Sequence, residues 1–257
     1  MSYTLLRQFK TDSATLTESS ENAMLPVENV TDARPGKVWE TGTSSATETI
    51  VFDLGSAQTI SAIGFVRPPD KFESVTNFDL EANSSDSWGT PAFTHSGING
   101  AVKTSVETFT GQIYRYWRVT FDKNASSDAN QIGRLALGVQ DASVSQAIDF
   151  EGFSEQYIDQ TSTVQAEGGS YSDQRYMRRV WTVPISDISN SDKQNIDTQF
   201  EALGKHTPFW IQYDATELPN WHYVKFQEAP QFENTGHDGT ALIWSVTLRF
   251  AEEQNDL

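Results

Sequence analysis

The sequence predicts a mainly β protein made of two β-sandwich domains, the second of which also contains one α-helix. Three observations predict this class. Apolar and polar residues alternate in several short segments, and clusters rich in Ser, Thr, Asn, Asp and Gly separate these segments. Only one segment combines helical apolar spacing with end signals. The chain has 257 residues, which exceeds the usual size of a single domain, so two domains are expected.

Several segments of the first half have the pattern of β-strands. In "TETIVFDLGS", Ile50, Phe52 and Leu54 alternate with polar neighbours, and Gly55 predicts a turn that ends the strand. "QTISAIGFVRPP" is apolar on both faces until its prolines, which indicates burial on both sides. "TNFDLEANSS" and "QIGRLALG" are shorter strands of the same kind. In "YRYWRVTF" the apolar side is set by Trp117, Val119 and Phe121.

A domain boundary is expected in "GVQDASVSQA", where aromatic residues disappear and small polar residues take over. The predicted domains are therefore residues 1–142 and 143–257. In the second domain, "MRRVWTVPIS", "TPFWIQYD", "NWHYVKFQEA" and "ALIWSVTLRFAE" are predicted strands.

One helix is predicted at about residues 191–204. Ser191 is a suitable N-cap, and Gln194 three positions later completes a capping box. Apolar residues then recur at helical spacing, and Gly204 ends the run.

The composition excludes several classes of function. The formal net charge is −17, and such a surface repels phosphate backbones and anionic lipids, so neither nucleic acid nor a membrane is an expected partner. The chain has no cysteine, which excludes disulfides, thiol catalysis and thiolate metal sites. No signal peptide or long apolar run is visible, so synthesis in a cytoplasm is expected.

No catalytic motif is present. The four histidines are far apart in sequence and lack metal-ligand spacing, and nucleophile-elbow, phosphate-loop and EF-hand patterns are missing. We therefore expect no catalytic residues and no enzymatic activity. A glycosidase that uses a pair of carboxylates is a remote alternative, because sequence does not show which acids come together in space.

Residues 10–140 resemble the discoidin, or coagulation-factor type C, family. The resemblance rests on Asp32 followed by Trp39, on Asp53-Leu54-Gly55, on the apolar strand from Ile60 to Val66, and on the aromatic strand from Tyr114 to Phe121. It implies a galactose-binding-like jelly-roll β-sandwich. Within that fold, Trp39 is expected in the core.

The resemblance also implies a ligand-binding end formed by loops, often for carbohydrate. These loops lie near residues 36–47 and 67–74, where the candidate binding residues are Arg67, Asp70, Lys71 and Phe72. An aromatic face can stack on a sugar ring, and planar polar groups can bind its hydroxyls; the plainer alternative is a solvated surface. The family often holds a structural calcium at the first Asp turn, so Asp32 is the candidate metal residue, although Ala33 replaces the usual glycine.

Residues 150–253 resemble the distal tail family of long-tailed bacteriophages, whose domain packs into a ring at the tail tip. The resemblance rests on the order of the strands and the helix, and in many members of that family this part comes first rather than second. It implies a homo-oligomeric ring, with candidate contacts at Trp210, Trp221 and Trp244, whereas the alternative places these tryptophans in the core.

Together the two resemblances predict a structural virion protein of a phage tail tip, made in the host cytoplasm. Its expected partners are copies of itself, other tail proteins such as tube, hub and fibres, and host-surface glycans. The alternative is a non-catalytic carbohydrate-binding module protein of a polysaccharide-degrading or adhesive system. No cofactor is predicted apart from the structural calcium.

Overall fold

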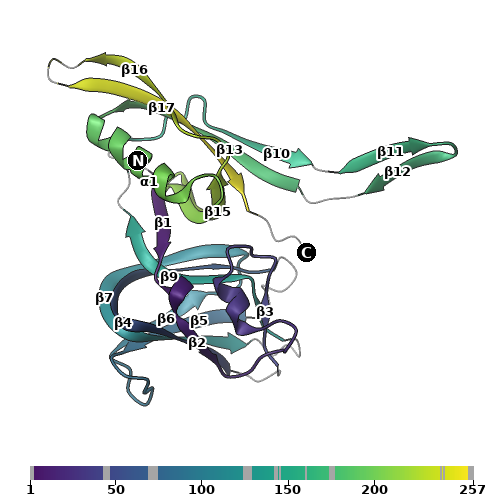
Figure 1. Cartoon of the computed structure of the whole chain (residues 1–257), viewed down its shortest axis with the longest axis vertical. Helices are drawn as coiled ribbons and strands as arrows, with labels where there is room; N and C mark the ends of the chain where they lie inside the picture. Colours follow the sequence, from purple (N-terminus) through teal and green to yellow (C-terminus); the bar gives the residue numbers. More distant parts are fainter. Residues whose placement is uncertain are drawn as a thin grey trace. The chain divides into compact units, whose positions relative to one another are not determined.

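The computed structural model describes residues 3–42, 47–68, 75–123, 129–141, 144, 146–159, 161–173, 177–237, 239 and 241–253. The chain divides into two compact units (Figure 1). The first unit is Leu5–Asp141, and the second is Ala142–Asp256 together with Met1–Thr4. The sequence analysis put the first residues in the first domain. Tyr3 joins the second unit because its ring is buried and its hydroxyl donates a hydrogen bond to Gln199 Oε1 at 3.0 Å.

The first unit is an antiparallel β structure with two 3-10 turns, and the mainly β prediction is confirmed. Its strands follow the order β1-β9-β4-β7-β5-β6, with β2 paired to β4, and β3 pairs with β8 in a separate ladder. The elements are β1 (Thr4–Phe9), η1 (Thr11–Ser13), β2 (Thr15–Glu18), η2 (Val27–Thr31), β3 (Trp39–Glu40), β4 (Thr47–Val66), β5 (Val75–Asn83), β6 (Phe93–Asn99), β7 (Thr104–Lys123), β8 (Gln131–Ile132) and β9 (Arg134–Asp141).

Strands β4 and β7 are each 20 residues long and pair along most of their length. The turn predicted at Gly55 is instead an irregularity inside β4, where the register moves from Asp53↔Tyr116 to Gln58↔Tyr114. Gly55 has φ +74°, which costs little without a side chain. The bulge lets one strand serve two partners: its first part pairs with β2, and its last part pairs with β9.

Aromatic rings fill the core of the first unit. Phe78 packs edge to face on Phe65 and on Phe121, with centroid distances of 4.8 and 5.1 Å, and Trp39 lies 5.5 Å from Phe121. The side of β7 predicted to be apolar is confirmed, since Trp117, Val119 and Phe121 are all fully buried.

The second unit contains an antiparallel sheet in the order β10-β13-β17-β15-β14, with β16 paired to β17. Helix α1 packs on it: Ile196 and Leu203 are buried, and the Phe200 ring lies 5.3 Å from that of Phe226. Figure 1 shows α1 alongside β17. The elements are β10 (Ser154–Asp159), β11 (Ser162–Ala166), β12 (Gly169–Asp173), β13 (Met177–Ile188), α1 (Asn190–Leu203), β14 (Phe209–Asp214), β15 (Leu218–Phe226), β16 (Gln231–His237) and β17 (Leu242–Glu252).

The predicted helix is present, but its N-cap is Ser189 rather than Ser191. Ser189 Oγ accepts a hydrogen bond from Asp192 N at 3.1 Å and donates one to Asp192 Oδ2 at 2.8 Å. This reciprocal pair places the acidic residue in the first turn, where the helix dipole stabilises it. Gly204 ends the helix with φ +56°, as expected.

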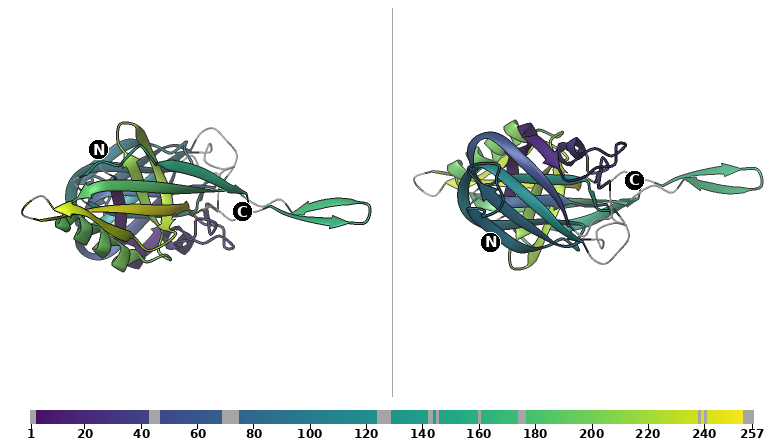
Figure 2. Two further views of the ribbon diagram at one scale, coloured as in Figure 1. Left: turned by 90° about the horizontal axis from the view of Figure 1, so that it is seen from above. Right: turned by 90° about the horizontal axis from the view of Figure 1, so that it is seen from below.

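Strands β11 and β12 form a two-stranded hairpin of their own. Both views in Figure 2 show it without a neighbouring strand. In the hairpin Val164 pairs with Tyr171, and the two side chains are 61% and 67% exposed. No helix among the described residues is long and apolar enough to span a bilayer.

Candidate functional site

Arg67 is the one predicted carbohydrate-binding residue among the described residues, and the structure places it in the interior rather than on a loop surface. Its side chain is fully buried, with Nη1 donating to Gly100 O at 3.0 Å and Nε to Gln131 O at 3.2 Å. Burial lowers the pKa of Arg67 to about 10. Arg67 thus holds neighbouring loop segments together. Asp70, Lys71 and Phe72 lie outside the described residues.

Asp32, the candidate calcium residue, is engaged by cationic side chains. Its Oδ1 accepts hydrogen bonds from the backbone N and Nε of Arg34, and its Oδ2 lies 2.8 Å from Arg34 Nη2 and 3.1 Å from Lys37 Nζ. The hydrogen bonds from Arg34 are the main reason why the pKa of Asp32 is far below its usual value. Because both oxygens already bind cations, the Asp32 carboxylate does not fit a calcium ligand here. The short 3-10 turn η2 directly precedes Asp32.

A partly exposed set of aromatic, arginine and carboxylate side chains lies on the outer face of β4, β7 and β5. Tyr116 is paired with Asp53 on one side and Asn83 on the other, and Arg118 is paired with Glu81. Residues two apart on a strand share a face, so Tyr116 and Arg118 point the same way. We call this set the aromatic–arginine cluster; it comprises Asp53, Glu81, Trp88, Arg115, Tyr116 and Arg118.

Each aromatic ring of the cluster is stacked against an arginine that a carboxylate holds. The Arg118 guanidinium lies 4.7 Å from the Trp88 ring centre, and its Nε donates to Glu81 Oε2 at 2.7 Å. The Trp88 indole N–H donates to Asp86 Oδ1 at 2.7 Å. The loop between β5 and β6 thereby brings Trp88 over the sheet, where cation–π contact fixes its orientation.

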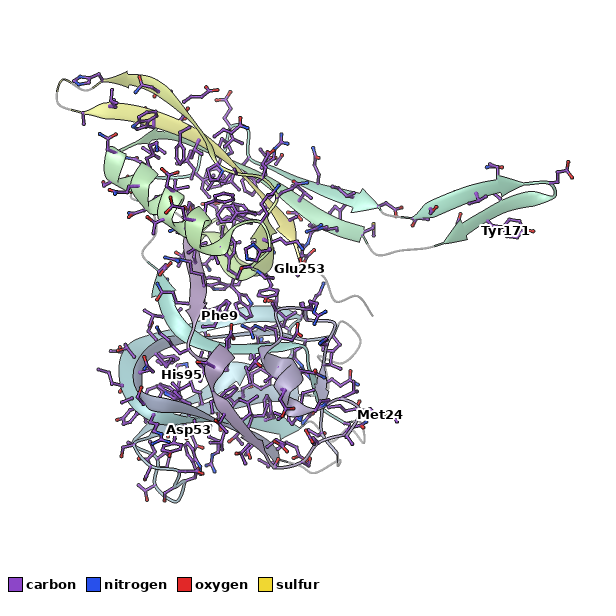
Figure 3. The ribbon with its side chains drawn as sticks, in the orientation of Figure 1. Phe9, Met24, Asp53, His95, Tyr171 and Glu253 are labelled. Atoms are coloured by element: carbon purple, nitrogen blue, oxygen red, sulfur yellow. The ribbon has the colours of Figure 1, made fainter. Side chains whose placement is uncertain are left out.

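The second pair in the cluster follows the same design. Arg115 makes two 2.7 Å hydrogen bonds to Asp53, and its guanidinium lies 4.8 Å from the Tyr116 ring centre. Hydrogen bonding by Arg115 lowers the pKa of Asp53, so that carboxylate stays ionised at neutral pH. Asp53 is labelled on the first unit in Figure 3.

The cluster combines flat apolar rings with fixed donors and acceptors on a partly exposed face. This combination suits a ligand with an apolar ring face and many hydroxyls. The candidate binding residues predicted from the sequence do not include Trp88. A signal was available, because a tryptophan in a polar loop has no alternating strand to bury it.

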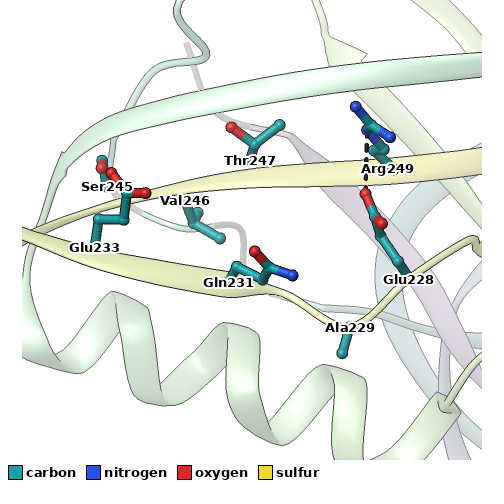
Figure 4. A pocket seen from close by; sticks show the side chains of 8 residues that line it. All are labelled: Glu228, Ala229, Gln231, Glu233, Ser245, Val246, Thr247 and Arg249. Carbon is teal, nitrogen blue, oxygen red and sulfur yellow. Dashed lines mark ion pairs between the residues drawn. The ribbon is translucent and has the colours of Figure 1, made fainter.

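The second unit has an open groove of about 420 Å³ beside β16 and β17 (Figure 4). Arg249 and Glu228 form an ion pair across it at 3.1 Å. The lining of the groove includes no aromatic residue. Its lining residues are Glu228, Ala229, Gln231, Glu233, Ser245, Val246, Thr247 and Arg249.

The three tryptophans predicted as oligomer contacts have different environments. The structure places Trp210 in the core: it is fully buried, with its ring 4.5 Å from that of Tyr223. Trp221 is partly exposed. Trp244 is also partly exposed, and its indole N–H donates to Asn190 Oδ1 at 2.7 Å. Only Trp221 and Trp244 therefore have surface that a neighbour could contact.

No group of three or more His, Cys, Asp or Glu side chains within the described ranges is arranged to hold a metal ion.

Comparisons with known proteins agree with the architecture of the first unit. The family model of the F5/8 type C domain matches residues 13–135. The first unit thus contains an F5/8 type C, or discoidin-like, domain, as its sequence resemblance implied. No curated protein matches the chain.

Several solved structures are similar to about half of the chain. Chitosan-binding module 2 of a chitosanase/glucanase from Paenibacillus sp. IK-5, in complex with chitotriose, is 19% identical over 51% of this chain and 99% of that one, with a TM-score of 0.43. The family 32 CBM from C. perfringens NanJ, in complex with galactose, is 15% identical over 53% and 100%, with a TM-score of 0.42. A Streptococcus pneumoniae fucose binding module is 14% identical over 51% and 95%, with a TM-score of 0.44.

Proposed function

We propose that this protein is a non-catalytic carbohydrate-binding protein that binds its ligand through the first unit. The observation that carries the proposal is the F5/8 type C match over residues 13–135. The aromatic–arginine cluster adds a site of suitable chemistry on the same unit. This reading corresponds to the alternative raised by the sequence, a carbohydrate-binding module of a polysaccharide-degrading or adhesive system, and the comparisons give no support to the tail-protein resemblance.

Within the cluster, Trp88 and Tyr116 are the rings on which a sugar would stack, and the carboxylates of Asp53 and Glu81 are the acceptors for its hydroxyls. Glu81 Oε2 and both oxygens of Asp53 already accept from arginine, which fixes their positions before a ligand arrives. Such preorganisation reduces the entropy lost on binding.

The test is a glycan array with the full chain, followed by calorimetry on the best glycan. We expect Trp88→Ala and Tyr116→Ala each to weaken binding by about tenfold or more, because each removes a stacking surface. Tyr157→Ala is the matched control, since that tyrosine lies on β10 of the second unit, is 64% exposed and should leave affinity unchanged.

The same experiment separates the proposed function from the proposed site. Phe72→Ala and Lys71→Ala test the loop end that the sequence suggested. Loss of binding in these variants, with Trp88→Ala unaffected, would move the site while keeping the function. No binding to any glycan by the wild-type protein would contradict the function itself.

A second candidate function is assembly into a homo-oligomeric ring at a phage tail tip, and one observation supports the assembly. The β11–β12 hairpin exposes Val164 and Tyr171, and its described side chains are exposed on both faces. An isolated two-stranded hairpin is only marginally stable, so a partner surface would stabilise it. In that role the protein would be a virion component with other tail proteins as neighbours, and the copies would turn weak sugar contacts into avid attachment.

Light scattering after size exclusion, at increasing protein concentration, tests the assembly. We expect wild-type protein to form a closed oligomer and Tyr171→Ser to shift it toward the monomer, because the substitution removes apolar area from the hairpin. Trp88→Ala serves as the control with unchanged mass. A wild-type chain that is monomeric at the highest concentration would exclude the ring.

A further inference from the structure

A buried arginine occupies the turn at which the discoidin-like resemblance places a structural calcium. Arg134, the first residue of β9, has a side chain that is 1% exposed. Its Nη1 donates to the backbone carbonyls of Val30, at 3.4 Å, and Thr31, and its Nη2 donates to Asp12 Oδ1 at 2.6 Å. The flat guanidinium also lies 4.8 Å from the centre of the Phe9 ring.

The oxygens around Arg134 form a site for a cation. Val30 and Thr31 are the last residues of the short 3-10 turn η2, at the end where carbonyls lack partners within the helix. The Asp12 carboxylate comes from η1 and adds a negative charge. Backbone carbonyls together with a carboxylate are the ligands that calcium prefers, and a guanidinium can bind the same oxygens through hydrogen bonds.

A calcium ion and the Arg134 guanidinium cannot share these oxygens. Calcium binds its ligands at about 2.3–2.6 Å, which is within the volume that the guanidinium nitrogens occupy. The local charge also opposes a second cation. Arg34 and Lys37 pair with Asp32 directly after η2, so three basic side chains face two carboxylates in this region.

We propose that Arg134 is a built-in replacement for the structural calcium of the discoidin-like fold. Hydrogen bonds and the ion pair of its guanidinium connect η1 and η2 to the start of β9, so the first unit folds without a bound metal ion. The proposal does not depend on carbohydrate binding.

The test compares thermal unfolding of the full chain in EDTA, in calcium chloride and in magnesium chloride. For the wild-type protein we expect the same Tm in all three solutions. Arg134→Met removes the cation, so its Tm should fall equally in all three. R134E replaces the guanidinium with a carboxylate beside the same oxygens, so its Tm should be low in EDTA and rise with calcium by more than about 5 °C.

Lys205→Glu is the charge-reversal control, because that residue is exposed on the second unit and should give no calcium response. If R134E does not fold in EDTA, refolding on addition of calcium chloride, followed by circular dichroism, provides the same readout. Two results would overturn the proposal: a wild-type Tm that rises with calcium, or an R134E chain that responds to calcium in neither assay.

Discussion

Replacing Trp117 with alanine is expected to lower the free energy of unfolding of the first unit by about 3–5 kcal/mol. Trp117 is fully buried on β7, and its ring centre lies 6.0 Å from that of Phe93 and 6.2 Å from that of Phe109. Its indole N–H donates to Tyr114 O at 3.2 Å. The substitution therefore leaves a large cavity and removes a hydrogen-bond donor, and these losses add.

Urea unfolding of the full chain, followed by circular dichroism, measures this effect. The control is Ile113→Ala on the same strand, because Ile113 is 63% exposed and its loss should change the free energy of unfolding by less than about 0.5 kcal/mol. Equal losses for the two variants would contradict the burial of Trp117.

The second large effect is a loss of stability on acidification, caused by His222. Its ring centre lies 4.6 Å from that of Trp181, with the rings tilted by 45°, and its Nδ1 is buried without a hydrogen-bond partner among the described residues. Burial, reinforced by the positive charge of Arg179, lowers the pKa of His222 to about 4. The folded second unit therefore holds this ring neutral at a pH where an unfolded chain protonates it.

The direction in which the free energy of unfolding changes with pH follows from proton uptake. Between pH about 6.5 and about 4 the unfolded state binds a proton that the folded state does not, so the free energy of unfolding falls as the pH falls. The full difference is about 3 kcal/mol, and below pH 4 this group contributes no further loss. At neutral pH the ring is mostly unprotonated in both the folded and the unfolded state, so His222 then causes little loss in the free energy of unfolding.

Urea unfolding of the second unit at several pH values between 4 and 7.5 tests this prediction. His222→Phe keeps a flat ring that cannot be protonated, so its stability should depend less on pH than that of the wild-type protein. His237→Ala, at an exposed position, should retain the wild-type dependence. A wild-type slope in His222→Phe would assign the acid sensitivity to other groups.

A local pattern was sufficient to predict the elements and the faces that they bury. Alternation in "YRYWRVTF" identified Trp117, Val119 and Phe121 as the buried side of β7, because successive side chains of a strand point to opposite faces. Helical spacing and Gly204 placed α1 within one residue of its observed bounds, Asn190–Leu203. The N-cap differed because Ser189 and Ser191 are equally good caps, and only the path of the preceding strand selects one.

Features that depend on distant partners were decided by the tertiary structure. Gly55 has the local signal of a turn, yet it produces a bulge because β4 continues along β7 and onto β9. Arg67 was expected at a loop surface but is interior, bonded to carbonyls 33 and 64 residues away. Trp88, which was not among the candidate residues, lies over Arg118.

The amino-acid sequence by itself determined the class of fold, most strands, the helix and the discoidin-like character of the first unit. The tertiary structure alone decided which charged side chains are buried, and so which surfaces remain for a ligand. The physical reason is that alternation depends on neighbours along the chain, whereas a buried charge such as Arg134 is stable only when acceptors more than 100 residues away converge on it.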